Sequence, residues 1–231
     1  MKTIGLIGGM SWESSIEYYR IVNEAVRTKL GGLHSAKSLM YSVDFAEIEI
    51  LQHEGRWPEA AQVLIGAAKG LERGGADFIV LCTGTMHKVA DDIQAHIQIP
   101  MLHIADATAQ RVRDSGIRKI GLLGTRFTME EEFYIGRLVQ KHGLDVIVPN
   151  AHERGIVHRV IYDELVLGMM REPSKGRYID IIERMVKEGA EGVILGCTEI
   201  GLLVHEQDCS VPLFDTTKIH AMAAVEYALA E

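Results

Sequence analysis

Short apolar segments alternate with longer segments of mixed character along most of the chain. The apolar segments include "TIGLIGG", "DFIVLCT", "KIGLLGT", "DVIVPN" and "GVILGCT", and their length and β-branched residues predict buried strands. Longer segments such as "SSIEYYRIVNEAVRTKL" and "SKGRYIDIIERMVKEG" place apolar residues three and four positions apart, as amphipathic helices do. Apolar strands that alternate with helices predict an α/β fold with parallel sheets covered on both faces.

The pattern occurs twice. "IGLIGGMSWESSIEYY", which begins at Ile4, is similar to "IGLLGTRFTMEEEFYI", which begins at Ile120. "GGADFIVLCTGT", from Gly74, is similar to "EGAEGVILGCTE", from Glu188, and the two matches have nearly the same separation along the chain. The repeat predicts two pseudo-symmetric lobes. Because ligands bind beyond the carboxyl ends of parallel strands, where all four segments carry Gly or hydroxyl residues, we expect the site in the cleft between the lobes.

The second match indicates which residues are equivalent. Leu81 aligns with Leu195, so the counterpart of Cys197 is Thr83, and not Cys82. Successive strand residues point to opposite faces, so we expect Cys82 to face a helix if Thr83 faces the cleft. Proton-handling groups from two lobes suit racemisation, which needs a base on one face of a carbon and an acid on the other. A thiol has an unperturbed pKa of about 8.5, which helix N-termini lower, so we expect Cys197 to be the base.

These residues also carry a family resemblance. The chain resembles the aspartate/glutamate racemases from end to end, through "GLIGGMSWES", "CTGTMHK", "LLGTRFTMEEEFY", "GVILGCTEIGLL" and "VPLFDTTKIHA". The resemblance implies a cofactor-independent enzyme for aspartate and/or glutamate, with a catalytic cysteine from each lobe. The sequence departs from the family pattern at Thr83, where the first cysteine is expected, and at Gly84, where Asn is expected.

The departures have chemical consequences. A threonine hydroxyl is a very poor base at neutral pH, although it can return a proton directly or through water. In the family the second cysteine faces the α-hydrogen of the L enantiomer. The resemblance therefore implies that Cys197 deprotonates the L-substrate and that Thr83 works poorly in the reverse sense. Gly84 lacks the side chain with which the family Asn binds substrate.

Further substrate-binding positions follow from the family pattern. They lie in the two Gly-rich turns and beside the catalytic pair: Met10, Ser11, Gly84, Thr85, Thr125, Thr128, Thr198 and Glu199. Hydroxyls and backbone donors at helix N-termini are suited to carboxylates. Gln52 could reach a side-chain carboxylate. Glu199 is either an acid/base helper or a favourable charge in a first helical turn, and for His87 we favour a structural role over a catalytic one.

The resemblance also implies how the chain is organised and assembled. We expect a first lobe of residues 1–99, a second lobe of residues 100–211, and a C-terminal helix within residues 212–231 that returns to the first lobe. The family pattern further implies a homodimer.

Composition narrows the possible partners and location. A net charge of −8 and a pI near 5.7 argue against nucleic acid or an anionic membrane as partner. The N-terminal apolar run is too short for a signal segment or a span. Cys82, Cys197 and Cys209 show neither metal spacing nor a disulfide framework, which indicates a reducing cytoplasm. The ten histidines are scattered, so we expect no metal site.

Three other functions remain open. A broad-specificity amino-acid racemase, or a related cysteine isomerase or hydantoin racemase, would differ in the pocket around Gln52 and Thr125. A non-enzymatic amino-acid binding protein would have lost catalysis by replacing its first cysteine and Asn.

Overall fold

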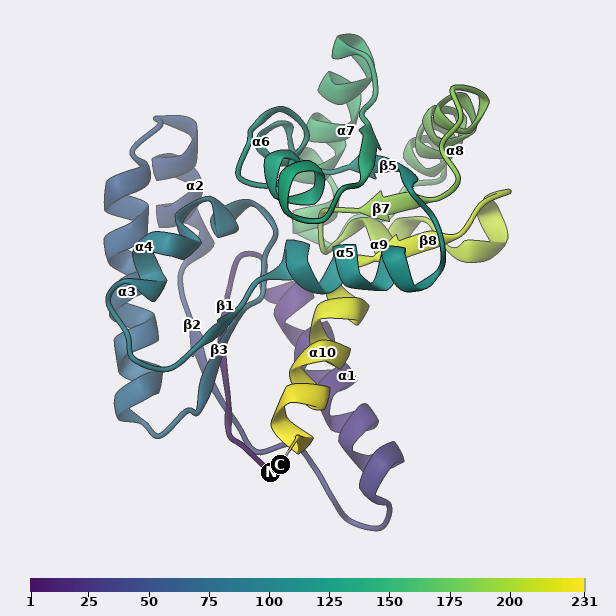
Figure 1. Ribbon diagram of the computed structural model, residues 1–231. Coiled ribbons are helices and arrows are strands. Elements are labelled where there is room, and N and C mark those ends of the chain that lie inside the picture. Colours follow the sequence, from purple (N-terminus) through teal and green to yellow (C-terminus); the bar gives the residue numbers. More distant parts are fainter. Residues whose placement is uncertain (231) are drawn as a thin grey trace. The chain divides into compact units, whose positions relative to one another are not determined.

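Two four-stranded parallel sheets form the framework of the chain, one in each of two units (Figure 1). The computed structural model describes residues 1–230. One unit comprises Met1–His103 and the C-terminal residues from His220 onward, and the other comprises Ile104–Ile219. The strand orders are equivalent, β2-β1-β3-β4 and β6-β5-β7-β8. The predicted α/β class with two similar lobes is therefore confirmed.

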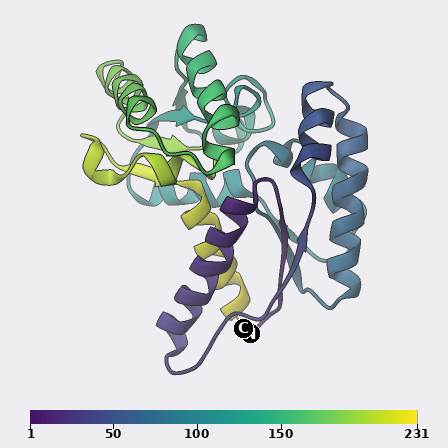
Figure 2. The same ribbon diagram turned by 180° about the vertical axis from the view of Figure 1, so that it is seen from behind.

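The first sheet is covered by helices on both faces. Its strands are β1 (Ile4–Gly8), β2 (Ser38–Ser42), β3 (Phe78–Leu81) and β4 (Met101–Leu102). One face packs against α2 (Phe45–His53), α3 (Trp57–Arg73), the 3-10 turn η1 (Thr85–Val89) and α4 (Ala90–Gln94). The other face packs against α1 (Trp12–Leu30) and the part of α10 (Thr216–Leu229) that begins at His220, and these two helices lie side by side (Figure 2).

The second sheet repeats this arrangement. Its strands are β5 (Lys119–Leu123), β6 (Asp145–Ile147), β7 (Val193–Leu195) and β8 (Leu213–Asp215). One face packs against α7 (Ala151–Asp163), the turn η3 (Leu165–Leu167), α8 (Glu172–Lys187) and α9 (Ile200–Leu203). The other packs against α5 (Ile104–Asp114) and the π-helical turn η2 (Arg137–Lys141). Two short elements complete the unit, α6 (Arg126–Glu130) and η4 (Glu206–Asp208).

All five predicted strands are present, whereas three strands of the structure were not predicted. β2 is a partly exposed edge strand, so its sequence lacks a continuous apolar run. β4 contains only two residues, which is too few to produce a recognisable period. β8 contains three residues and ends at the charged Asp215, so no apolar run of strand length marks it.

The unit boundaries differ from the expected ones by a few residues. The first unit extends to His103, beyond the expected end at residue 99. The C-terminal return begins at His220 instead of residue 212, because β8 pairs with β7 in the second sheet before α10 starts. Within residues 1–230, no helix is long and apolar enough to cross a membrane.

Candidate active site

The first unit gathers its expected site residues at the carboxyl ends of neighbouring strands. Met10 and Ser11 follow β1, and Thr83 to Thr85 follow β3. β1 and β3 are paired, and the Cys82 amide donates to the carbonyl of Ile7 at 2.9 Å, so the two loops adjoin.

Hydrogen bonds hold the loop after β1 against the loop after β3. The hydroxyl of Ser14 donates to the carbonyls of Ser11 and Cys82, at 3.1 and 3.4 Å. The Ser11 side chain caps α1 by accepting from the Ser14 amide at 3.5 Å. Gln52, near the end of α2, is buried, and its Nε2 lies 3.0 Å from Sδ of Met86 in η1. The structure thus brings the expected residues of this lobe into one region.

Cys82 and Thr83 have different environments, as strand alternation predicts. Cys82 is fully buried in the core between the sheet, α1 and α10, and burial raises the pKa of its thiol far above the ordinary value. The prediction that Cys82 faces a helix is confirmed. Thr83 is 7% exposed. Gly84 has φ −76° and ψ −52°, which any residue adopts, so the backbone does not require a glycine there.

Three buried histidines pack behind the Thr83 loop. The ring centroid of His87 lies 4.6 Å from that of His103 and 5.7 Å from that of His220. Nδ1 of His87 donates to the carbonyl of Thr83 at 2.8 Å, because a carbonyl can only accept. This contact ties His87 to the Thr83 loop, and the structural role favoured for His87 stays a prediction. The sequence does not predict the cluster, because the chain neighbours of His103 and of His220, which lies in the motif "VPLFDTTKIHA", give no indication of it.

His220 connects three elements of the first unit. Its Nε2 donates to the carbonyl of Leu102 at 3.0 Å, so its Nδ1 must accept from the hydroxyl of Tyr18 at 2.9 Å. Burial, with a further contribution from His87, lowers the pKa of His220 to about 3. The neutral ring thus joins α10 to α1 and β4.

Replacing His220 with Gln is expected to flatten the pH dependence of stability. His220 protonates near pH 6.5 in the unfolded chain but resists protonation in the folded protein. Its contribution to the free energy of unfolding is therefore complete above that pH and is lost as the pH falls. His220 should contribute a fall of roughly 1 kcal/mol per pH unit to the free energy of unfolding between roughly pH 6 and 4 in the parent chain. Urea unfolding across this range should show a smaller slope for His220→Gln and an unchanged slope for the exposed control His34→Gln. Equal slopes in the parent and His220→Gln would contradict the assignment.

The second unit forms the equivalent arrangement around Cys197. Thr125 follows β5, and its hydroxyl accepts from the Thr128 amide at 3.3 Å and contacts the Thr128 hydroxyl at 3.1 Å. Cys197 to Glu199 follow β7, which pairs with β5. At Gly196 a Cβ would lie 2.8 Å from the carbonyl oxygen of Leu123, so glycine permits this close approach of the two loops.

The Glu199 carboxylate contacts the side chains of the two residues that precede it, Cys197 and Thr198. Its Oε2 accepts from Sγ of Cys197 and from the hydroxyl of Thr198, each at 2.9 Å. Cys197 is 8% exposed, and Thr198 and Glu199 are also buried. The hydroxyl of Thr217, at the start of α10, donates to the carbonyl of Thr198 at 3.2 Å and fixes the loop.

The pKa expected for Cys197 is wrong. Burial and then the negative charge of Glu199 raise the pKa of the thiol well above its ordinary value, and these effects outweigh the backbone amides of Thr198 and Glu199 that lower it. The helix that follows, α9, contains only four residues and is too short to compensate for burial. The thiol of Cys197 is therefore neutral and donates a hydrogen bond to the Glu199 carboxylate.

Within residues 1–230, no three His, Cys, Asp or Glu side chains gather as they would around a metal ion. The chemistry available in the two loops is that of a thiol, a carboxylate and several hydroxyls.

The sequence model of the Asp/Glu/hydantoin racemases matches residues 7–224. The chain belongs to this family. Three similar proteins agree with the assignment. A candidate Asp/Glu racemase from Yersinia pestis is 59% identical, with full coverage of both chains and a TM-score of 0.92. An aspartate racemase homologue from Pyrococcus horikoshii is 39% identical, also with full coverage of both chains, and has a TM-score of 0.85. The broad specificity amino-acid racemase RacX of Bacillus subtilis is 24% identical over 74% of each chain.

The racemase family membership confirms the resemblance drawn from the motifs. The protein is an isomerase of the racemase type. Its Thr83 and Cys197 occupy equivalent places after β3 and β7, the third strands along the chain in their respective sheets.

Proposed function

We propose that this racemase interconverts the enantiomers of aspartate and/or glutamate by proton transfer at Cα without a cofactor. Cys197 acts as the base for the L enantiomer, and Thr83 serves the opposite face. The observation that carries this proposal is the 2.9 Å contact between the Cys197 thiol and the Glu199 carboxylate, which gives the thiol proton an acceptor.

Each proton has a defined path in this mechanism. Glu199 accepts the thiol proton, so the S–H bond breaks as an O–H bond forms. The Cys197 thiolate then takes the α-hydrogen of the L enantiomer, so the Cα–H bond breaks as an S–H bond forms. The carbanion takes a proton on its opposite face from the Thr83 hydroxyl or from a water beside it, and the proton held by Glu199 returns through solvent to the group that protonated the carbanion. Because the raised pKa of the thiol makes the thiolate rare at neutral pH, the transfer of the thiol proton to Glu199 is needed before Cys197 can take the α-hydrogen.

The L preference concerns proton exchange and not net racemisation. The two enantiomers are equally stable in water, so kcat/KM for racemisation must be equal in both directions. A carbanion formed by Cys197 can, however, be reprotonated on the same face by the same thiol. With Thr83 as the weaker partner, we expect L-substrate to exchange its α-hydrogen with solvent faster than it racemises.

The test is α-hydrogen exchange in D₂O, followed by proton NMR for L and D forms of a panel of amino acids. We expect rapid exchange from L-aspartate or L-glutamate and slower exchange from the D forms. Faster exchange from the D form would contradict the assignment of faces, and no exchange from any amino acid would contradict the function.

Several groups support an acidic substrate. Buried hydroxyls follow β1, β3, β5 and β7, namely those of Ser11, Thr85, Thr125, Thr128 and Thr198. Hydroxyls at helix starts suit carboxylates. We assign to Gln52 the binding of the side-chain carboxylate of the substrate. We assign to the backbone groups of Met10 and Gly84, in their loops, the binding of its α-carboxylate. Broad specificity is the second candidate, favoured by the similarity to RacX, and the same panel distinguishes the two.

Replacing Glu199 with Gln is expected to lower the rate of L exchange by about 10²-fold, because the amide cannot accept the thiol proton. KM for substrate should change little, since the two side chains have the same shape. Glu206→Gln, an exposed carboxylate in η4, is the matched control. An unchanged exchange rate in Glu199→Gln would show that another group deprotonates Cys197.

We propose that the protein acts in the reducing cytoplasm as a homodimer through the outer face of α1. All three of its cysteines are free thiols. Trp12, Ile16 and Tyr19 are 61%, 52% and 54% exposed and share one helical face, since they lie four and three positions apart. Such a stripe is typical of a protein interface.

Ile16→Asp is expected to shift the sedimenting species from dimer to monomer, because it places a charge in the apolar stripe. Leu167→Asp, at an exposed leucine of the second unit, should leave the parent state unchanged. If Ile16→Asp sediments as the parent protein does, α1 is not the interface.

A further inference from the structure

A cationic pocket lies at the amino ends of the strands in the second unit, opposite to Thr125 and Cys197. Its walls come from the end of α5, the segment before β5, and the segment between η2 and β6. The expected site residues follow the carboxyl ends of β5 and β7 instead. The pocket is therefore separate from the candidate active site within this unit.

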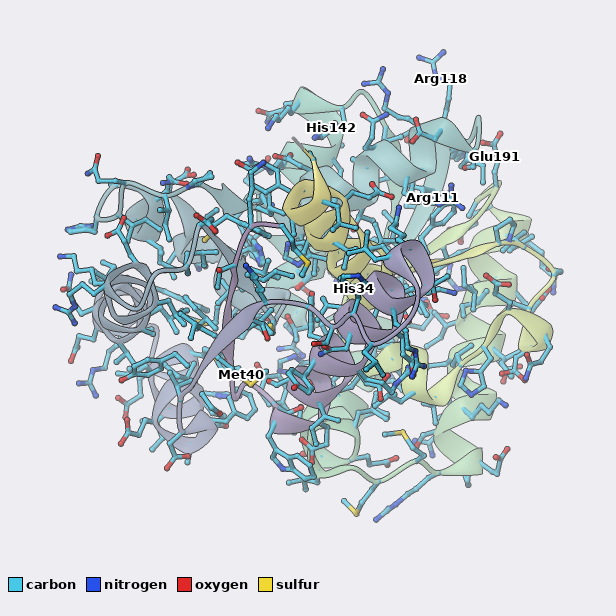
Figure 3. All side chains as sticks on the ribbon, turned by 90° about the horizontal axis from the view of Figure 1, so that it is seen from below. His34, Met40, Arg111, Arg118, His142 and Glu191 are labelled. Atoms are coloured by element: carbon cyan, nitrogen blue, oxygen red, sulfur yellow. The ribbon has the colours of Figure 1, made fainter. Side chains whose placement is uncertain are left out.

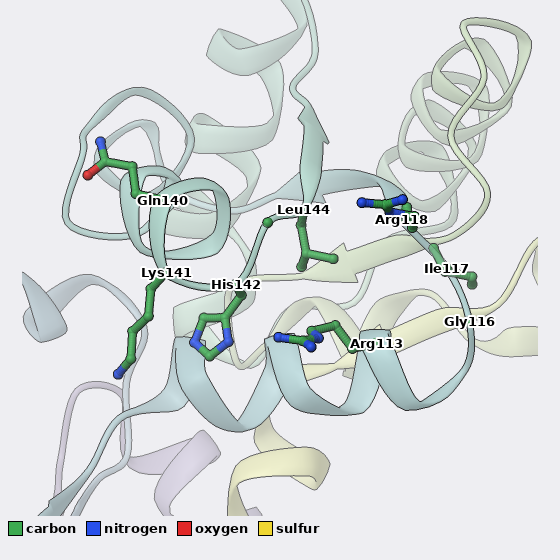
Figure 4. A pocket seen from close by; sticks show the side chains of 9 residues that line it. Arg113, Gly116, Ile117, Arg118, Gln140, Lys141, His142 and Leu144 are labelled. Atoms are coloured by element: carbon green, nitrogen blue, oxygen red, sulfur yellow. The ribbon is translucent and has the colours of Figure 1, made fainter.

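The pocket is positively charged although the whole chain carries a net charge of −8. Arg113, Arg118, Lys141 and His142 line it, and among the described residues no Asp or Glu does. The volume is about 520 Å³, which lies within the range of small-molecule sites. Figure 4 shows the guanidinium group of Arg113 directed toward the His142 ring, while Lys141 and Gln140 point away.

A carboxylate outside the pocket organises one wall. Asp106 of α5 accepts from Arg137 at 2.7 Å, from Lys141 at 2.8 Å and from Nε2 of His142 at 2.8 Å. Burial alone would raise the pKa of Asp106, but these hydrogen bonds hold it well below its usual range. The single negative charge of Asp106 is thus shared by Arg137, Lys141 and the imidazole of His142. This wall of the pocket therefore keeps a net positive charge. The hydrogen bond to Asp106 also holds the His142 ring in one orientation.

The two arginines are available for a ligand. Neither Arg113 nor Arg118 forms a side-chain ion pair with any described residue. Arg118 extends outward from the ribbon (Figure 3), while its backbone amide donates to Glu191 at 3.1 Å and anchors the segment. A guanidinium group binds a phosphate through two parallel hydrogen bonds, so each of the two arginines can bind one phosphate group. Buried Leu144 and partly buried Ile117 give the pocket an apolar part.

We propose that this pocket is a second ligand site that binds a small organic diphosphate of nucleoside diphosphate size. Arg113 and Arg118 bind the phosphate groups, His142 contributes a further polar contact, and Ile117 and Leu144 contact the organic part. The proposal is independent of the proposed function, because none of these residues belongs to the candidate active site.

Calorimetric titration of the full chain with ADP tests the site, with AMP and adenosine as a series of decreasing charge. We expect ADP to bind saturably, and each of Arg113→Ala and Arg118→Ala to weaken its binding by about 10-fold. Affinity should also fall as salt rises, because exposed charges are screened. Arg111→Ala is the matched control, since Arg111 lies on the same helix, is exposed (Figure 3) and does not line the pocket.

Two further measurements keep the result unambiguous. Thermal unfolding of each variant shows whether that variant is folded. The charge-conserving variants Arg113→Lys and Arg118→Lys should bind ADP more tightly than the alanine variants do. Saturating L-aspartate should leave ADP affinity unchanged if the sites are separate. Absence of saturable ADP binding in the parent protein, equal affinity in the parent and the folded double alanine variant, or displacement of ADP by L-aspartate would overturn the proposal.

Discussion

Cys197→Ala is expected to lower the rate of α-hydrogen exchange from L-aspartate or L-glutamate by about 10²–10⁴-fold, the usual contribution of a positioned base. The substitution removes the thiol that Glu199 contacts at 2.9 Å and leaves no group there to take the α-hydrogen. NMR exchange in D₂O measures the rate directly. Substrate binding should persist, because a thiol contributes little to holding a carboxylate.

The other two cysteines provide the controls for this experiment. Cys209→Ala should exchange L-substrate at the parent rate, since Cys209 lies between η4 and β8 and has no contact with the Glu199 carboxylate such as Cys197 makes. Cys82→Ala should also retain the chemistry, because Cys82 is sealed in the core of the first unit. Exchange by Cys197→Ala within a few-fold of the parent rate would show that the thiol is not the base.

The second large effect is expected from Thr83→Cys. A thiol ionises far more readily than a hydroxyl, so this substitution should raise α-hydrogen exchange from the D enantiomer by about 10²-fold. Racemisation should accelerate as well, because a thiol at position 83 delivers a proton to the opposite face of the carbanion faster than the threonine hydroxyl does. Exchange from the L enantiomer should change little, since Cys197 still performs that step.

Thr83→Ser is the matched control, because it keeps the hydroxyl and should keep the parent ratio of L to D exchange. Thermal unfolding should show that Thr83→Cys is folded, as expected for a near-isosteric change at a site that is 7% exposed. If D exchange in Thr83→Cys stays as slow as in the parent protein, residue 83 does not handle the proton.

The strands and the repeat were predictable because their information is local. A buried parallel strand must be apolar along its length, and such runs are present as β1, β3, β5 and β7. The partly exposed edge strand β6 was also marked by an apolar run. The alignment of Thr83 with Cys197 needed only the strand period, and the structure places both residues directly after equivalent strands. The short strands β4 and β8 escaped prediction because pairing to a neighbouring strand defines them.

The site chemistry was less predictable because it depends on burial. The sequence suggested that a helix start would lower the pKa of Cys197, but enclosure by the second unit and contact with Glu199 raise it. The role of Glu199 was open for the same reason, since its neighbours in sequence do not show that its carboxylate is buried against a thiol. The sequence does not predict the cluster of His87, His103 and His220, because folding brings these residues together from distant segments of the chain.

The sequence by itself determined the α/β class, the internal repeat, the racemase family, and the substitution of threonine for the first catalytic cysteine. These features are written in residue types and their spacing, which do not depend on distant parts of the chain. Only the tertiary structure decided the protonation of Cys197, the neutral state of His220 and the gathering of Arg113, Arg118 and His142 around one pocket. Charge and proton affinity respond to desolvation and to groups brought close by folding, and neither is fixed until the chain has packed.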